Sequence, residues 1–425
     1  MSDTSVTPRA ATARWTCPFC LLLCDTATVQ VDDAGALILS DPVPGGGCAC
    51  ARRALARFTA RPSTASPRVD GQDCSLAEAI AAAARVLAAS RQPLFGGLGT
   101  DVSGARALYR LACRTGAICD AAEGEALMTT LRATQDRGSF FTTLAEVRTR
   151  ADLIVCVGGT PVRQAPEFFD RCGVGEALVA QRRVVVLGGG TADGAVLDSL
   201  RARPGVTVDT IPLHGDLFST VALLSALVAG RAVREAPAAL QSLATQLRQA
   251  RYAVIVGETR TLPRQGALVV ESIHRAVGTL NQSTRAAAMW LGGGNGAGTV
   301  NQVFTWLSGL PLRSRAGPLG LEHEPLCFDA QRLLSDAAVD SLLWVSSFDP
   351  DLAPPATAQP TLVLGHPELA RVPAAVFIPV STPGIGSPGH LFRADGSVML
   401  PLFAVHDDGL PTLAGVLDRI AGALA

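Results

Sequence analysis

Residues 152–161 read DLIVCVGGTP, an uninterrupted apolar run that ends in two glycines, a threonine and a proline. Two later stretches repeat this arrangement: RVVVL at 183–187 precedes three glycines, and YAVIV at 252–256 precedes Gly257. Strands that are apolar on both faces are typical of a parallel sheet that helices cover on both sides. The three stretches therefore predict a parallel α/β sheet.

The rest of the chain also alternates predicted strands with predicted helices. Ser75 and Glu78 form a capping-box pattern before an Ala-rich helix that we expect to end near Ser90, and a second helix is expected over 102–115. We predict an α/β fold with three parts. A small Cys-rich domain of iron–sulfur type, with a β-hairpin, covers 1–66; one Rossmann-like α/β domain combines 67–150 with 300–425; a second, inserted one covers 151–299.

Four cysteines near the N-terminus carry the candidate chemistry. Cys17, Cys20 and Cys24 have the spacing C-x2-C-x3-C, and Cys50 follows twenty-six residues after Cys24. A [4Fe-4S] cluster needs four thiolates that converge on one cube, and a short loop can supply three of them. Residues 28–39 predict a hairpin that brings the fourth thiol back. We predict Cys17, Cys20, Cys24 and Cys50 as the metal ligands, with Cys48 as the spare.

Three other interpretations of these cysteines stay open. Structural zinc also takes four cysteines, but usually as two separated pairs. A redox C-x-x-C motif normally follows a strand, and no strand is predicted before Cys17. The thiols also fit an inherited ligand set that is now empty. The remaining cysteines are predicted core residues: Cys74, Cys113, Cys119, Cys156, Cys172 and Cys327.

Composition excludes several classes of function. The chain has 425 residues, of which 48% are hydrophobic and 17% charged, and its formal net charge of -1 gives no reason to expect nucleic acid as a partner. No apolar stretch reaches the length of a membrane span, and residues 1–15 lack the pattern of a signal peptide, so we expect a cytoplasmic protein. All 36 basic residues are arginine. This excludes a P-loop lysine and a Schiff-base lysine.

Glycine-rich turns after the predicted strands are a weak sign of nucleotide binding. None of them matches G-x-G-x-x-G, although such turns lie where open α/β folds bind ligands. The richest loop, GGGNGAG at 292–298, could approach a phosphate closely or could serve as a flexible or tightly packed connection. The six histidines show no metal-ligand spacing, and no catalytic triad is nominated.

Five segments together resemble a known family. The chain is similar to the B-type subunit of formylmethanofuran dehydrogenase, a relative of the molybdopterin-dependent formate dehydrogenases. The segments that carry the resemblance are 16–25, 93–120, 152–161, 301–309 and 382–396. The resemblance implies a small cluster domain followed by Rossmann-like domains. It also implies that the usual C-terminal β-barrel is absent from this chain and belongs to a separate subunit.

Departures from the family pattern bear on the function. The family holds molybdenum or tungsten between two pterin guanine dinucleotides, with a cysteine or selenocysteine ligand and a histidine and an arginine nearby. The position of the Cys-His pair corresponds to residues 121–128, AAEGEALM, which contain neither residue. The arginine corresponds to the region of Gly292, and the Asn-Pro that clamps a nucleotide is Thr160-Pro161. We therefore expect no molybdenum or tungsten pterin centre and nominate no catalytic residue.

A B-type subunit without the metal ligand is what the resemblance implies for the formyltransferase/hydrolase complexes of methylotrophic bacteria. These complexes move a formyl group from tetrahydromethanopterin to a methanofuran-type carrier and hydrolyse it to formate, on other subunits. The expected function is a non-catalytic scaffold that docks hydrolase, transferase and barrel-type subunits, without nucleic acid or membrane as a partner. One alternative is an active molybdenum or tungsten formylmethanofuran dehydrogenase subunit with a [4Fe-4S] cluster. The other is a zinc-stabilised monomer.

Overall fold

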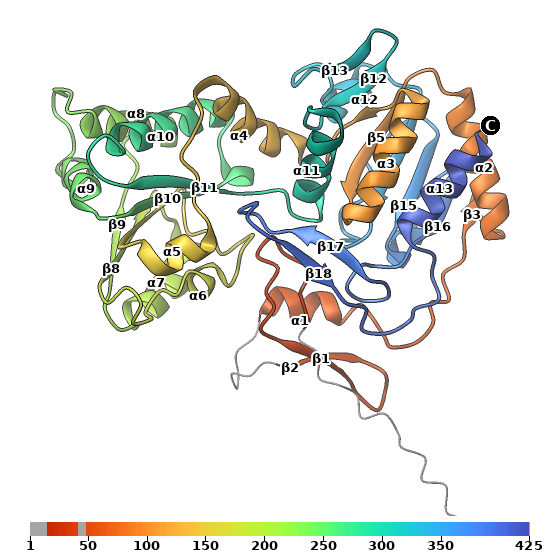
Figure 1. The fold of residues 1–425 in the computed structure, drawn as a ribbon, viewed down its shortest axis with the longest axis horizontal. Helices are drawn as coiled ribbons and strands as arrows, with labels where there is room; N and C mark the ends of the chain where they lie inside the picture. Colours follow the sequence, from red (N-terminus) through yellow and green to blue (C-terminus); the bar gives the residue numbers. More distant parts are fainter. Residues whose placement is uncertain (1–14, 41–47, 425) are drawn as a thin grey trace, which may run out of the picture.

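Two α/β units lie side by side, with the Cys-rich segment against both (Figure 1). The computed structural model describes residues 15–40 and 48–424. One unit is built on a five-stranded sheet and the other on a nine-stranded sheet, and we call them the five-stranded unit and the nine-stranded unit. The predicted parallel α/β architecture is confirmed.

The five-stranded unit has a wholly parallel sheet. Its strands span Leu153–Val157 (β7), Arg182–Leu187 (β8), Val206–Ile211 (β9), Ala253–Glu258 (β10) and Ala286–Leu291 (β11). They follow the order β11-β10-β7-β8-β9, so that β7, the first in sequence, lies in the middle. Three of these strands are the stretches from which the sheet was predicted.

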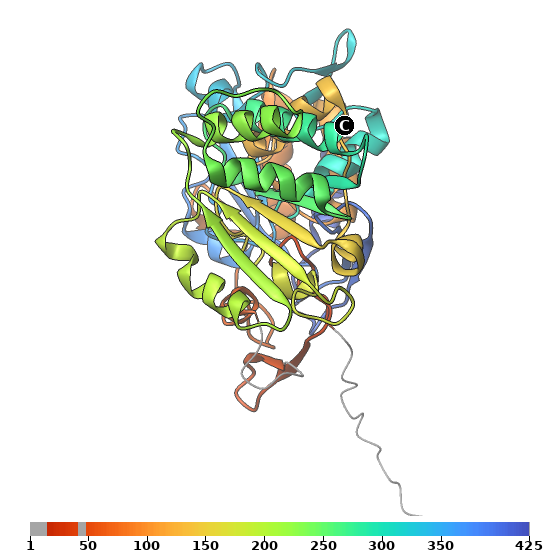
Figure 2. The same ribbon diagram turned by 90° about the vertical axis from the view of Figure 1, so that its left-hand side faces the viewer.

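Helices cover both faces of this sheet (Figure 2). They span Leu144–Arg150 (α5), Phe168–Arg171 (α6), Gly194–Arg201 (α7), Leu217–Val228 (α8), Ala238–Gln249 (α9) and Gly266–Leu280 (α10), with short 3-10 turns at Thr191–Asp193 (η1) and Thr259–Thr261 (η2). Successive strand residues point to opposite faces. Leu153, Val155 and Val157 of β7 accordingly pack with α8–α10, whereas Ile154 and Cys156 pack with α5–α7.

The nine-stranded unit combines segments from before and after the five-stranded unit. Its strands span Arg68–Val69 (β3), Gln72–Asp73 (β4), Pro93–Gly99 (β5), Ile118–Cys119 (β6), Ser314–Gly317 (β12), Gly320–His323 (β13), Ser341–Ser346 (β14), Thr361–Gly365 (β15) and Val376–Pro379 (β16). Their order is β13-β12-β6-β5-β14-β15-β16-β3-β4, with a parallel centre from β6 to β16 and antiparallel pairs at both edges. The predicted domain boundaries stay a prediction.

Four helices pack on one face of this sheet, and a smaller apolar cluster fills the other. The helix Leu76–Ala89 begins with the predicted capping box: the side chain of Ser75 accepts from the amide of Glu78, and the side chain of Glu78 accepts from the amide of Ser75. The second begins at Asp101, whose carboxylate accepts from two helix amides, and ends at Gly116 with φ 68°. The helices span Leu76–Ala89 (α2), Val102–Thr115 (α3), Ala297–Ser308 (α11) and Leu413–Ala423 (α13), with Ala330–Ser335 (α12) and the turn Pro367–Arg371 (η3) elsewhere in the unit.

The Cys-rich segment contains the predicted hairpin and a short helix. Strands Thr28–Val31 (β1) and Leu37–Ser40 (β2) pair across a turn in which Asp32 Oδ1 accepts from the amides of Ala34 and Ala36. Helix α1, Ala49–Leu55, packs with this hairpin against Ile385 of the nine-stranded unit. A second hairpin, Gly389–Phe392 (β17) and Met399–Leu402 (β18), and helix Gly124–Arg137 (α4) complete the described structure.

The prediction that the six other cysteines are core residues is partly wrong. Cys119, Cys156 and Cys172 are buried, whereas Cys113 and Cys327 are exposed. Both exposed thiols lie in amphipathic or loop segments, where an apolar neighbour in sequence does not place a residue in the core. Within residues 15–40 and 48–424, no helix is long and apolar enough to cross a lipid bilayer.

Candidate functional site: a thiol cluster beside a cavity

A tight loop over residues 17–24 places three of the predicted ligands. The amide of Cys17 bonds the carbonyl of Cys24 at 2.9 Å, and the amide of Leu23 bonds the carbonyl of Cys20 at 3.3 Å. Leu23 adopts φ 47° and is buried against Phe348. The loop therefore closes on itself with its thiols gathered on a short stretch of backbone.

The structure places the four predicted ligands and Cys48 within electrostatic range of one another. Cys17, Cys20 and Cys48 are buried, while Cys24 and Cys50 are partly exposed. The thiol of Cys20 donates to Cys24, the thiol of Cys50 donates to Cys48, and Cys17 lies within electrostatic range of both pairs. Spacing in the sequence favoured Cys50 over Cys48 as the fourth ligand, whereas the fold places both beside the loop.

Two of the thiols are predisposed to ionise. The hydrogen bond from Cys20 lowers the pKa of Cys24, and the charge of Arg171 acts in the same direction. The hydrogen bond from Cys50, with two backbone amides at the start of α1, lowers the pKa of Cys48 to about 6. Burial raises the pKa of Cys17. Thiolates are the form in which cysteine binds metals, so the site already stabilises part of the charge that a ligand set carries.

The donor set fits an iron–sulfur cluster in kind and number. Five cysteines with apolar walls from Trp15 and Leu37 suit a cluster that thiolates alone bind. In the described part of the chain, however, no three potential ligands converge on a single centre. Cys17, Cys20, Cys24 and Cys50 as metal ligands therefore stay a prediction.

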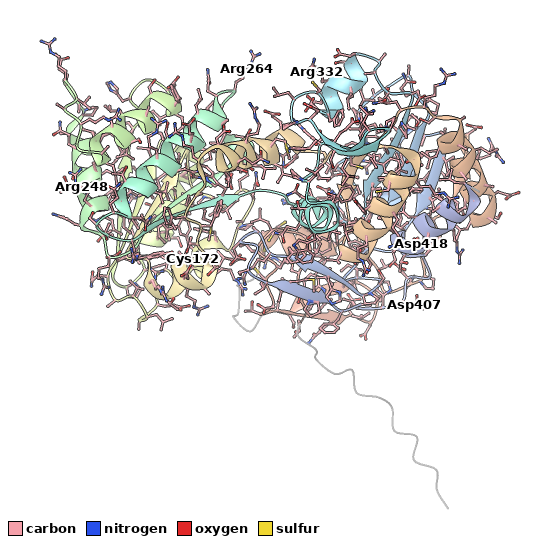
Figure 3. The ribbon with its side chains drawn as sticks, turned by 45° about the horizontal axis from the view of Figure 1, so that its top comes forward. Cys172, Arg248, Arg264, Arg332, Asp407 and Asp418 are labelled. Atoms are coloured by element: carbon pink, nitrogen blue, oxygen red, sulfur yellow. The ribbon has the colours of Figure 1, made fainter. Side chains whose placement is uncertain are left out.

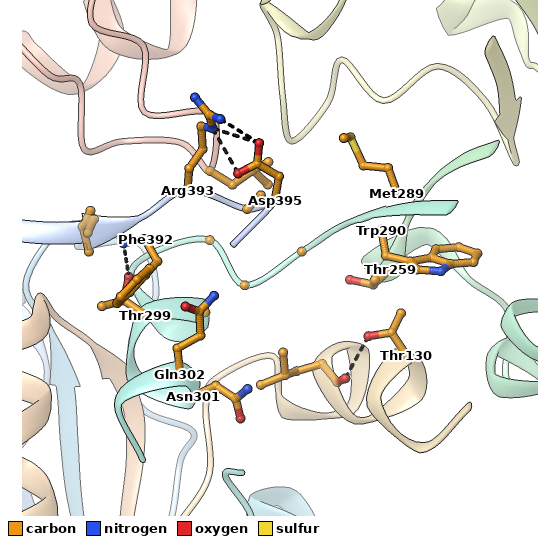
Figure 4. Close-up of a pocket in the computed structure, with 18 of the residues that line it drawn as sticks. Thr130, Thr259, Met289, Trp290, Thr299, Asn301, Gln302, Phe392, Arg393 and Asp395 are labelled. Atoms are coloured by element: carbon orange, nitrogen blue, oxygen red, sulfur yellow. Dashed lines mark hydrogen bonds and ion pairs between the residues drawn. The ribbon is translucent and has the colours of Figure 1, made fainter. Parts of the chain in front are cut away.

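A cavity of about 350 Å³ opens next to the thiol loop, between the two units. Cys20 and Leu21 form one wall, and the others come from α4, the loop 292–298, the start of α11 and the β17–β18 hairpin (Figure 4). Most polar groups on its walls are uncharged, such as Thr130, Asn301 and Gln302. The sequence alone does not reveal this cavity, because its walls come from segments far apart in the chain.

The glycine loop 292–298 is a packed wall of the cavity. Gly293, Asn295 and Gly296 have φ values of 75°, 52° and 78°. A Cβ on Gly296 would lie 2.3 Å from the carbonyl oxygen of Thr100 at the end of β5, and Asn295 Nδ2 donates to Ser346 Oγ at 3.1 Å. The glycines therefore permit close contact with the nine-stranded unit, one of the two roles expected for this loop.

Charges on the cavity walls neutralise one another. Among the described residues that line the cavity, Arg393 is the one cation, and its guanidinium forms three hydrogen bonds of 2.8–3.2 Å with Asp395. The Asp395 carboxylate also accepts from the amide of Leu144 of the five-stranded unit at 2.9 Å. In the view of Figure 4 the pair lies at the edge of the cavity, facing each other.

An ion-pair network around a buried arginine occupies the stretch at which the resemblance places a metal ligand, although Glu125, its member within residues 121–128, is 69% exposed. Arg313 is 1% exposed and adopts φ 60°. Its guanidinium bonds Asp120 at 3.3 Å, Glu125 at 3.0 Å and Asp329 at 2.5 Å. Residues 120–125 are therefore fixed by charge pairs, with no thiol or imidazole among them.

These residues do not fit a metal held by two pterin guanine dinucleotides. A cavity of about 350 Å³ matches one small ligand, since drug-sized ligands occupy sites of about 300–1,000 Å³. Two dinucleotides also carry four phosphate groups, and the arginine on the walls is already paired. Within residues 15–40 and 48–424, Cys20 is the only thiol that lines the cavity, and no histidine lines it. Figure 3 shows the side chains on both units, with Cys172 labelled in the five-stranded unit.

Known proteins similar to this chain agree with its fold. No family model matches the chain. It is 31% identical to the B-type subunit of the formyltransferase/hydrolase complex of Methylorubrum extorquens over 372 residues, which cover 84% of this chain and 97% of that protein. It is 25% identical over 421 residues to the B-type subunit of a tungsten-containing formylmethanofuran dehydrogenase of Methanocaldococcus jannaschii, covering 89% and 90% of the two chains.

Solved structures extend the comparison. A chain in the crystal structure of the M. extorquens formyltransferase/hydrolase complex with methylofuran superposes with a TM-score of 0.74 and 30% identity, covering 84% of this chain and 98% of that one. Acetylene hydratase from Pelobacter acetylenicus superposes with a TM-score of 0.64 at 12% identity, over 97% and 69% of the two chains, which shows a shared fold alone. Since a relative at 31% identity is covered over almost its whole length, this chain belongs to the family of the B-type subunits of formyltransferase/hydrolase complexes.

Proposed function

We propose that the chain is a non-catalytic scaffold subunit of a formyltransferase/hydrolase complex in one-carbon metabolism. The observation that carries the proposal is the network around Arg313, which occupies the stretch where the family resemblance places a metal ligand. Family membership supplies the context, because a relative at 31% identity is a named subunit of such a complex. Formyl transfer and hydrolysis then take place on other subunits.

The Cys-rich segment has a structural role in this proposal. Leu21 and Leu22 pack into the core of the five-stranded unit, whereas Leu23 packs with the nine-stranded unit. A [4Fe-4S] cluster held by Cys17, Cys20, Cys24 and Cys50 would supply four metal–thiolate bonds that cross-link this loop to α1. The loop itself joins the units through its leucines and through the bond from the Ala394 amide to the Leu21 carbonyl.

The proposed partners are hydrolase, transferase and barrel-type subunits in the cytoplasm. Large exposed apolar side chains mark protein–protein contact sites when they gather on one surface. Trp306 is 66% exposed and stacks edge-on with Phe392 at 4.9 Å, on the helix and hairpin that border the cavity. A scaffold with permanent partners accounts for apolar surface of this kind.

Metal analysis of the complex purified without oxygen tests the proposal. About four iron atoms per copy of this chain, without molybdenum or tungsten, is the expected result. Molybdenum or tungsten near one per copy would overturn it in favour of an active formylmethanofuran dehydrogenase subunit. One zinc per copy in a monomer would favour a zinc-stabilised protein. If the complex contains no iron, the scaffold proposal stands, but the four cysteines do not hold a cluster.

A further inference from the structure

One carboxylate joins the two glycine-rich turns at the middle of the five-stranded sheet. Asp193 Oδ1 accepts from the amide of Thr160 at 2.9 Å and from Thr160 Oγ1 at 2.5 Å, while Oδ2 accepts from the amide of Gly190 at 2.8 Å. Thr160 follows β7, whereas Gly190 and Asp193 follow β8. Three donors from two loops therefore converge on one side chain.

Two glycines make room for this carboxylate. A Cβ on Gly159 would lie 3.4 Å from Asp193 Oδ2, and a Cβ on Gly189 would lie 3.3 Å from the same oxygen. Gly159 also has φ 126°, a conformation that residues with side chains rarely adopt. Glycines that let the backbone approach an anion, amide donors and the start of a helix are the parts of a phosphate-binding turn.

The position in the sheet is the one at which open α/β folds bind ligands. The order reverses between β7 and β10, because the chain runs from β7 to β8 and β9 on one side and from β10 to β11 on the other. Ligands bind beyond the carboxyl ends of the strands at such a point. In this chain, the turn after β7, which forms one side of that point, bonds a carboxylate that the loop after β8 supplies.

Neighbouring charges make the crevice unfavourable for a second anion. Glu258, at the end of β10, is 5% exposed and accepts from the amide of Gln164 at 3.0 Å. Arg163 is the cation that acts on both Asp193 and Glu258. The two carboxylates outnumber this one cation, so a phosphate brought to this edge would meet a surplus of negative charge.

We propose that Asp193 fills a phosphate-type anion site in the five-stranded unit. The three donors that would hold a phosphate bond the Asp193 carboxylate instead. In the intact chain this edge therefore takes up neither free phosphate nor the phosphate groups of a nucleotide. Removal of the carboxylate leaves the donors and the two glycines in place, and the site becomes open to an external anion.

Thermal unfolding of the full-length chain with inorganic pyrophosphate tests the proposal. Asp193→Ser removes the carboxylate, and Asp198→Ser on α7 is the matched control, because the side chain of Asp198 is 78% exposed and pairs with Arg201 one turn along the same helix. We expect Asp193→Ser to unfold at a lower temperature than the wild type and to regain about 2 °C or more, saturably, with pyrophosphate. The wild type and Asp198→Ser should respond no more than to sodium chloride of equal ionic strength.

Two results would overturn the proposal. One is a saturable rise in the Tm of the wild-type chain with pyrophosphate, which would show that the site is open. The other is a folded Asp193→Ser chain without any specific response to pyrophosphate. If the serine variant fails to fold, Asp193→Ala, which also removes the carboxylate and leaves no acceptor oxygen, is measured in its place with the same two criteria.

Discussion

Arg313 holds together three segments of the nine-stranded unit. Its guanidinium is buried and satisfies carboxylates from the end of β6, the start of α4 and the start of α12. Burial raises the pKa of Asp120 to about 6 even though Arg313 opposes the shift. A buried charge whose partner is removed costs far more than the pair contributes. The sequence shows that the Cys-His pair is missing but does not reveal the role of Arg313, because Asp120 and Glu125 lie about 190 residues away in the chain.

Arg313→Met should lower the free energy of unfolding by about 3–5 kcal/mol at pH 7, because Asp120 is left buried without its partner. The folded-state pKa of Asp120 then lies well above its unfolded value near 4, so lowering the pH from 7 to 5 should return part of the loss. Urea unfolding at both pH values measures this loss and its recovery.

Arg110→Met is the control. The Arg110–Asp418 pair is about half exposed, so its loss should lower the free energy of unfolding by less than about 1 kcal/mol. Equal losses in the two variants would contradict the assignment.

A buried histidine predicts loss of stability in mild acid. His274 is 4% exposed, its Nε2 accepts from Trp290 Nε1 at 3.0 Å, and burial lowers its pKa to about 4. The unfolded chain binds the proton at pH values below about 6.5, so stability should fall between pH 6.5 and 4. His274→Gln, which keeps an acceptor without titrating, should reduce this slope in urea unfolding. The exposed His390→Gln should leave the slope unchanged, and a slope equal in both variants would exclude His274 as its source.

At the level of elements, local pattern predicted helices α2 and α3 and strands β7, β8 and β10, but not their neighbours in the sheets. The capping box of α2 and the apolar runs of β7, β8 and β10 can each be recognised from a few consecutive residues. The hairpin β17–β18 and the walls of the cavity depend on contacts between distant segments. The cysteine spacing likewise identified the loop 17–24, whereas the approach of Cys48 to Cys17 and Cys24 depends on how α1 packs.

The loop between β11 and α11 provides a matched pair of glycine substitutions. Gly296→Ala should be strongly destabilising, by about 2 kcal/mol or more, because its φ is 78° and a Cβ would meet the Thr100 carbonyl. Gly294→Ala places a Cβ in open space and should change stability by less than about 1 kcal/mol. Thermal unfolding of the two variants compares them. Similar Tm values would show that the loop moves freely away from β5.

For the whole molecule, the surface around Trp306 is the expected contact with a partner subunit. Trp306→Ser should weaken assembly of the complex by about tenfold or more, since large aromatic side chains dominate interface energies. The Tm of the isolated chain should change little. Leu178→Ser, at a site 62% exposed in the five-stranded unit, is the control for a general loss of apolar surface. If the two variants give the same co-purification yields and affinities, Trp306 is not part of the interface.

The interleaved order of the nine-stranded sheet also determines when each unit can form during synthesis. β5 pairs with β14 about 250 residues later in the chain, and β3 pairs with β16 about 300 residues later. The strands of the five-stranded sheet are contiguous in sequence, so that unit can fold while the ribosome is still making residues 300–425. Until then β5 has no partner on the side that β14 will occupy. A nascent chain of this protein therefore exposes an apolar parallel strand for most of its translation, a state in which chaperones bind.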